Sequence, residues 1–309
     1  MFKSFQYGGQ AVIEGVMMRG PKDLAVAVRK PDGNIIVEKQ DLPSWSKKFP
    51  FFKKPILRGF LALLESLVLG IKALSFSAGQ ATDEEEEELT AKEIAITIFI
   101  AFGLAIALFV VLPTWGAQFV ARSQNEIWKN IIEGVMRISV FLLYVISISR
   151  MKDIQRVFQY HGAEHKVIST YEAGQDLAVS NARSYSNLHP RCGTSFLLIV
   201  MVLTILMFSF LAFDSLLWRI LSRILLMPLV AGIAYEIIKF SGKNADKKWV
   251  RIISTPGMWL QKMTTREPDD SQIEVAIQAL EAVLASEAAA EELTADKDQS
   301  ICVRGEGTC

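Results

Sequence analysis

Histidine and cysteine are scarce in this sequence, which contains only three of each in 309 residues. The formal net charge is zero. The start, MFKSFQYGGQ, has no apolar stretch after its first lysine, so we do not expect a signal peptide. Glycine is dense between residues 8 and 20, yet no phosphate-binding pattern occurs there. These absences direct attention to two features that are present: long apolar runs, and one window that holds every histidine.

The apolar runs have the length of membrane-spanning helices, which is about 20 residues. The composition is 51% hydrophobic and the mean hydropathy is +0.28. Residues 94–112 and 195–213 carry no charge, while residues 131–149 and 216–240 carry two and four charged side chains. The sequence therefore predicts an α-helical integral membrane protein with about four transmembrane helices at these positions.

A further apolar stretch, residues 55–78, is interrupted by Arg58, Glu65 and Lys72. Their spacing of seven places them on one face of a helix. Each charge would cost about 2.5–3.5 kcal/mol in a membrane-spanning helix, whereas a helix lying in the interface avoids this cost. We therefore favour an interfacial or re-entrant helix here over a fifth span.

The distribution of lysine and arginine predicts the orientation in the membrane. These residues concentrate in residues 47–72, 150–191 and 239–251, whereas the connection between the first two spans has only Arg122 and Lys129. Both termini and the loop at 150–194 are therefore expected on the cytoplasmic side of a cytoplasmic (inner) membrane. All three cysteines fall on this reducing side, so disulfide bonds are not expected.

The domain organisation follows from these boundaries. A small β-rich cytoplasmic module is expected first, because two β-rich runs flank the turn sequence Pro31-Asp32-Gly33. Near the other end, Ser271 and Glu274 have the spacing of a capping box that opens an amphipathic helix. The predicted segments are the N-terminal module at 1–54, the interfacial or re-entrant helix at 55–80, an acidic linker at 81–93, transmembrane helices at 94–149, the cytoplasmic loop at 150–194, transmembrane helices at 195–240, a cytoplasmic segment with the amphipathic helix at 241–287, and a disordered tail at 288–309.

The histidine window suggests a metal site. If residues 156–171 are helical, His161 and His165 lie one turn apart on the same face, which is the geometry in which two imidazoles bind one metal. Glu164 completes an H-x-x-E-H sequence, in which the glutamate activates water as a general base. His189 and Cys192 follow in the sequence HPRC. Three histidines and one cysteine suit zinc, and Glu164 is the candidate catalytic residue.

Two versions of this site remain open from the sequence. Four protein ligands would close the site and make it structural, whereas three would leave one coordination position open. Glu172 shares the helix face of His165 and is a further candidate ligand. Polar histidines at a helix that leaves the membrane are the alternative to any metal site.

Several charged side chains fall inside the predicted spans. Glu133 and Arg137 are spaced by four residues and could neutralise one another. Arg219 and Arg223 are expected near the outer end of their span, where long side chains extend to the lipid headgroups. Glu236 is expected either to reach the metal window or to pair with a nearby lysine.

Four longer motifs together resemble the YqhQ-type family of bacterial membrane proteins. They are GGQAVIEGVMMRGP (8–21), YHGAEHK (160–166), HPRCGTSF (189–196) and TTREPDDSQIEVAIQAL (264–280). The resemblance extends over residues 6–284. It implies a protein of unknown function, catalogued among predicted metal-dependent enzymes, and supports grouping the three histidines, Glu164 and Cys192 as one site. It implies no substrate.

Three classes of function are compatible with the sequence. The first is a membrane-embedded zinc hydrolase acting at the cytoplasmic face. The second is a non-catalytic scaffold or protein-insertion partner in which a closed metal site is structural, and which contacts another membrane protein or a second copy of itself. The third is a transporter, which is disfavoured because no matched pair of interrupted spans is visible. The lipid bilayer is the expected surrounding in each case, and no nucleic-acid partner is expected.

Overall fold

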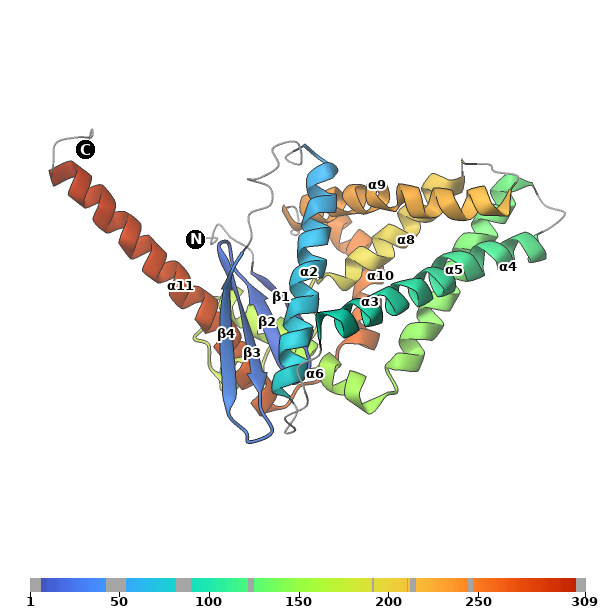
Figure 1. The fold of residues 1–309 in the computed structure, drawn as a ribbon. Coiled ribbons are helices and arrows are strands. Elements are labelled where there is room, and N and C mark those ends of the chain that lie inside the picture. Colours follow the sequence, from blue (N-terminus) through green and yellow to red (C-terminus); the bar gives the residue numbers. More distant parts are fainter. Residues whose placement is uncertain are drawn as a thin grey trace.

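The computed structural model describes residues 7–42, 54–81, 90–121, 125–190, 192–209, 211, 215–243 and 247–303. Within these residues the chain is mostly helical, with a small sheet near the N-terminus (Figure 1). Most of the predicted acidic linker lies outside the described residues, as does Cys309.

The N-terminal sheet is antiparallel and has the strand order β1 (Gly8–Val12), β2 (Gly15–Arg19), β3 (Asp23–Arg29) and β4 (Ile35–Asp41). Its β3–β4 hairpin turns at the predicted Pro31-Asp32-Gly33 sequence, where Gly33 has a φ of 88°. Glycine adopts this conformation without steric cost. The predicted small β-containing module is therefore confirmed, and β1 is one of its two edge strands.

Both faces of the sheet are covered by helices. One face packs against α6 (Lys152–Glu172) and α11 (Asp270–Val303), and the shared core includes Val16, Met18, Ala27, Tyr160, Ala163, Ile273 and Leu280. The other face packs against α2 (Leu57–Gln80) through Leu69 and Ala73. Because both faces are buried, β2 and β3 are almost continuously apolar rather than alternating.

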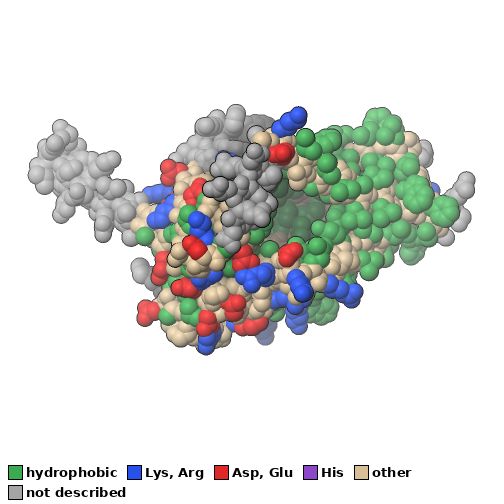
Figure 2. Space-filling model, turned by 60° about the horizontal axis from the view of Figure 1, so that its bottom comes forward, with side chains coloured by type: hydrophobic (Ala, Val, Ile, Leu, Met, Phe, Trp, Pro, Cys, Tyr) green, Lys and Arg blue, Asp and Glu red, His purple; other side chains and the backbone are tan. Residues whose placement is uncertain are grey.

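Within the described part of the chain, four helices are long and apolar enough to cross a membrane. They are α2, the continuous segment Ala95–Val120, Ile127–Ile148 within α5 (Glu126–Ile148), and Leu216–Ser241 within α9 (Leu216–Lys243). The segment Ala95–Val120 comprises α3 (Ala91–Ile106), the π-helical turn η2 (Ala107–Val111) and α4 (Leu112–Val120). Hydrophobic side chains cover the end of the molecule that these helices build, and charged ones surround the sheet (Figure 2).

The set of long helices differs from the predicted one in two places. The predicted span at 195–213 is described as a helix only over α8 (Thr194–Ser209), and most of the residues that follow it lie outside the described part of the chain. In contrast, α2 meets the length and hydropathy of a span despite its charged stripe. Two of those charges are paired within the protein, Arg58 with Glu236 and Glu65 with Arg19.

Arg219 and Arg223 are not at the lipid headgroups, which corrects the expectation from the sequence. Each side chain is 1% exposed. Arg223 donates from Nε and Nη2 to Glu133 at 3.0 Å, and also to Asn130 at 2.9 Å. The predicted pair of Glu133 with Arg137 is confirmed at 2.7 Å. One carboxylate in α5 therefore joins two arginines from two helices.

Glu236 is bound by Arg58 and is not among the residues that line the metal window. Arg58 donates to both of its oxygens, at 2.6 and 2.5 Å. Glycines bring α2 and α9 close enough for this pair, since a Cβ at Gly59 would lie 2.8 Å from the Tyr235 Cβ, and one at Gly232 would lie 2.5 Å from the Ile56 carbonyl oxygen. Glu236 therefore connects α2 to α9.

The cap of the last helix lies two residues before the predicted one. Asp269 accepts from the backbone N–H of Gln272 at 2.9 Å, and the Gln272 side chain accepts from the Asp269 N–H at 3.0 Å. This reciprocal pair is a capping box, and it leaves Glu274 to bind Arg29 at 2.7 Å. The helix then continues to Val303, past the predicted end at residue 287.

Candidate metal centre

Helix α6 carries the H-x-x-E-H sequence on a buried face. It starts after a short turn that follows α5, and His165 and Glu164 are 2% and 5% exposed. The predicted helix at 156–171 is therefore present. Cys192 lies beside this face of α6 and belongs to a different segment, the one that leads into α8. The site is thus built where two helices leave the apolar part of the molecule.

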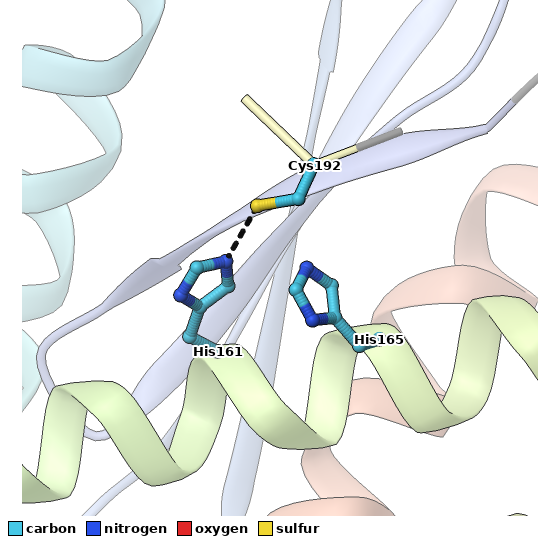
Figure 3. Close-up of side chains that lie close together, drawn as sticks. All are labelled: His161, His165 and Cys192. Carbon is cyan, nitrogen blue, oxygen red and sulfur yellow. Dashed lines mark hydrogen bonds between the residues drawn. The ribbon is translucent and has the colours of Figure 1, made fainter. Parts of the chain in front are cut away.

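Three of the four predicted ligands come together. The ligand atoms of His161, His165 and Cys192 all lie within 4.8 Å of one another. The two imidazoles stand side by side on α6, and the Cys192 thiol lies over His161 Nε2 at 3.2 Å (Figure 3). Two imidazole nitrogens and a sulfur form a donor set that suits zinc better than magnesium or calcium.

Backbone carbonyls orient both imidazoles. His161 Nδ1 lies 2.8 Å from the Thr264 carbonyl oxygen, and His165 Nδ1 lies 2.7 Å from that of Asn187. Because a carbonyl can only accept, each Nδ1 carries the proton and each Nε2 presents a lone pair. This is the arrangement in which metal-bound histidines are held.

His165 Nε2 is the strongest indication that a cation belongs here. The atom is buried and has no hydrogen-bond partner among the described residues. An unsatisfied buried acceptor is costly, so its lone pair calls for a ligand. Cys192 fits the same ligand, since its Sγ lies 3.2 Å from His161 Nε2 and accepts from the hydroxyl and the backbone N–H of Thr194 at 3.4 and 3.5 Å.

Glu164 lies beside the three donors. Its Oε1 accepts the backbone N–H of Gly9 in β1 at 2.9 Å, and its Oε2 lies 3.6 Å from His165 Nε2. The carboxylate is therefore fixed by the edge of the sheet. A carboxylate in this position can accept a proton from water that enters the site.

His189 is near the site but is not one of the three converging donors. Its ring centre is 5.8 Å from that of His165, and its Nε2 lies 3.5 Å from Glu172 Oε2. Gln261 fixes its backbone through two hydrogen bonds of 2.9 Å. Burial lowers the pKa of His189, and the negative charge of Glu164 partly offsets this effect. The two further candidate ligands, His189 and Glu172, thus contact each other.

A cavity of about 320 Å³ lies over the site. Its walls are formed by β1, α6 and the segment that leads into α8, and they comprise Tyr7, Gly8, Gly9, Gln10, Ala11, Val157, Phe158, His161, Glu164, His165, Ile168, His189, Cys192, Gly193 and Thr194. The metal donors and Glu164 are therefore accessible to a small group or a chain segment.

Several residues that build the site could not be assigned from the sequence. Thr264, Asn187 and Gln261 act through ordinary backbone and amide contacts, so their residue types carry no signal. The residue type of Gly162, in contrast, is informative. A Cβ there would lie 2.2 Å from the Arg266 carbonyl oxygen, so only glycine leaves room for the segment whose Thr264 carbonyl orients His161.

Lys166 holds the loop that carries Asn187. Its buried ammonium group donates to the carbonyls of Arg183 and Tyr185 at 3.0 and 2.8 Å, and it pairs with Glu267 at 2.7 Å. A lysine in this motif therefore stabilises the position of the carbonyl that orients His165.

Residues 54–286 match the protein family described as "Protein of unknown function (DUF1385)". The chain belongs to this family. The uncharacterized protein YqhQ of Bacillus subtilis (strain 168) is 36% identical over 302 residues, which cover 93% of this chain and 94% of that protein. The predicted resemblance to YqhQ-type proteins is thus confirmed. No solved structure matches the chain.

All four motifs of this DUF1385 chain meet at the candidate metal centre. Gly9 comes from the first, the α6 residues from the second, Cys192 from the third and Thr264 from the fourth. Segments that are far apart in the sequence therefore share one location, which is the arrangement expected of a functional site rather than of four separate structural motifs.

Proposed function

We propose that this protein is a zinc-dependent hydrolase that acts at the cytoplasmic face of the inner membrane. His161, His165 and Cys192 would hold the zinc. The observation that carries the proposal is the convergence of three oriented donors next to a fixed carboxylate, while His189 is directed to Glu172. Three protein ligands are the pattern of catalytic rather than structural zinc sites.

The roles of the residues follow from their contacts. Zinc in this site would supply a Lewis acid that acidifies water and polarises the bond to be cleaved. Glu164 would take the proton from the attacking water and deliver it to the leaving group, and Gly9 would hold the carboxylate in place through its N–H. The Nδ1 contacts keep both imidazoles in the tautomer that binds metal.

The position of the site supports action at the membrane surface. Among the described residues, four helices have the length and hydropathy of spans. Helix α6 follows one of them, α5, and Cys192 precedes the shorter apolar helix α8. We place the sheet, α6 and α11 on the cytoplasmic side because lysine and arginine concentrate there. We propose further that α2 lies at the interface, since Leu69 and Ala73 in its second half pack against the sheet.

The proposal predicts that a zinc chelator abolishes hydrolysis and that added zinc restores it. The detergent-purified full chain would be assayed with peptide, carboxylic-ester and phosphoester substrates before chelation, after chelation and after addition of zinc. A chain that holds zinc tightly but hydrolyses none of the three classes would contradict the catalytic proposal. That result would favour the structural metal site of a scaffold.

A further inference from the structure

The edge strand β1 presents backbone groups to the cavity. The bond from Arg29 N to Glu14 O shows that Glu14, Val16 and Met18 direct their backbone groups toward β3. Gly15, Met17 and Arg19 therefore bond to β1, through their partners Val12, Gln10 and Gly8. It follows that the backbone groups of Gly9, Ala11 and Ile13 point away from the sheet.

Side chains from helices already bind the outward-facing backbone N–H groups at the two ends of β1. Gly9 N donates to Glu164 at 2.9 Å, and Ile13 N donates to Ser77 at 3.2 Å. Ala11 lies between them and lines the cavity. Within the described part of the chain, no side chain or neighbouring strand bonds its outward N–H and C=O. This donor and acceptor are the pair that an added strand would use.

The neighbours of Ala11 leave room for a second backbone. At the start of the strand, a Cβ at Gly8 would meet nothing within 4 Å, so the space beside it is open. Across the cavity stand the apolar side chains of Val157, Phe158 and Ile168. An extended chain places alternate side chains on opposite sides, so one row could contact this apolar wall.

We propose that β1 binds an extended peptide as an additional strand, and that the substrate of the site is therefore a peptide or an unfolded protein segment. This inference rests on the proposed hydrolase function. Residues rise about 3.4 Å each along an antiparallel strand. A peptide residue paired with Ala11 therefore lies about 7 Å along the strand from Gly9. Since Gly9 binds Glu164, the peptide bond two residues further along reaches the carboxylate.

The reaction at that bond is hydrolysis, with water as the co-reactant. The water oxygen forms a bond to the carbonyl carbon, and the C–N bond breaks. Glu164 accepts one proton from the water and passes it to the departing nitrogen. The products are a carboxylic acid and an amine, which exchange the remaining proton to become a carboxylate and an ammonium group, and no oxidation or reduction takes place. Pairing of the substrate with Ala11 positions the carbonyl but takes no part in the proton transfer.

Ala11→Pro tests the strand pairing directly. Proline removes the outward N–H and fills its place with the ring, while the ladder to β2 does not use that N–H. Ala11→Ser is the matched control, because it keeps the N–H and nearly the same size. With a pool of quenched random decapeptides, we expect kcat/KM to fall at least about tenfold for Ala11→Pro, mainly through KM. Zinc content and thermal stability should match those of Ala11→Ser.

Hydrogen exchange in the chain with Glu164→Gln provides a readout that needs no turnover and no substitution in β1. The decapeptide pool should slow exchange of the amides in residues 9–13. Equal kcat/KM for Ala11→Pro and Ala11→Ser, or unchanged exchange in β1, would overturn the inference. Hydrolysis of esters or phosphoesters but not of peptides would also overturn it, and would leave the proposed hydrolase function standing. Failure of all three substrate classes would instead contradict that function.

Discussion

Glu164→Gln should reduce hydrolysis by the purified protein by about 10²–10⁴-fold. Glutamine has nearly the same size, and its amide oxygen can still accept the Gly9 N–H that holds the glutamate at 2.9 Å. It cannot, however, take a proton from water. The change therefore removes the chemistry and preserves the structure, so zinc content should be unchanged. The measurement is kcat/KM together with elemental analysis of the same preparation.

Glu172→Gln is the matched control for this change. Glu172 is another carboxylate on α6, but it contacts His189 rather than the three converging donors. We expect its substitution to alter kcat/KM by far less than that of Glu164. Retained activity in Glu164→Gln, or an equal loss in both variants, would contradict the assignment of Glu164 as the general base.

Glu133→Gln should lower the free energy of unfolding by about 3–5 kcal/mol. Glu133 is 2% exposed and is the carboxylate that binds both Arg137 and Arg223. Without its charge, the two buried guanidinium groups lose the anion that balances them. The apolar surroundings make this loss costly, because water does not reach the groups. Thermal unfolding of the detergent-purified protein would measure the effect.

Glu236→Gln is the control for the buried cluster. Its pair with Arg58 is more exposed, with 25% and 38% of the two side chains accessible. An ion pair of this kind contributes about 0–1 kcal/mol. A Glu133→Gln variant that unfolds at the same temperature as Glu236→Gln would show that the arginine cluster does not depend on Glu133.

Much of the fold could be predicted from local patterns, while the ion pairs of α2 could not. The turn at Pro31-Asp32-Gly33 and the uncharged run at 94–112 each determine a structure within a few residues. For α2, the sequence placed Arg58, Glu65 and Lys72 on one helix face but did not identify their partners. The structure pairs two of them with Glu236 and Arg19, which lie far away in the sequence. The same long-range pairing brought Arg223 into the interior.

The candidate site shows the same division. The regular helical period predicted that His161, Glu164 and His165 share a face. The spacing of His189 and Cys192 predicted nearness, but a loop does not fix the direction of its side chains. Gln261, 72 residues away, holds the backbone of His189 by hydrogen bonding, and the His189 ring lies toward Glu172. The carbonyls that orient the two imidazoles belong to Thr264 and Asn187, and no sequence pattern marks a carbonyl.

Elemental analysis of the detergent-purified protein tests the central claim most directly. The wild type would be compared with His165→Ala, Cys192→Ser and His189→Ala. We expect about one zinc per chain in the wild type and in His189→Ala, and loss of zinc in the other two variants. Absence of zinc from the wild type would contradict the metal site. Loss of zinc in His189→Ala as well would indicate a closed, four-ligand structural site and would contradict the open site proposed for catalysis.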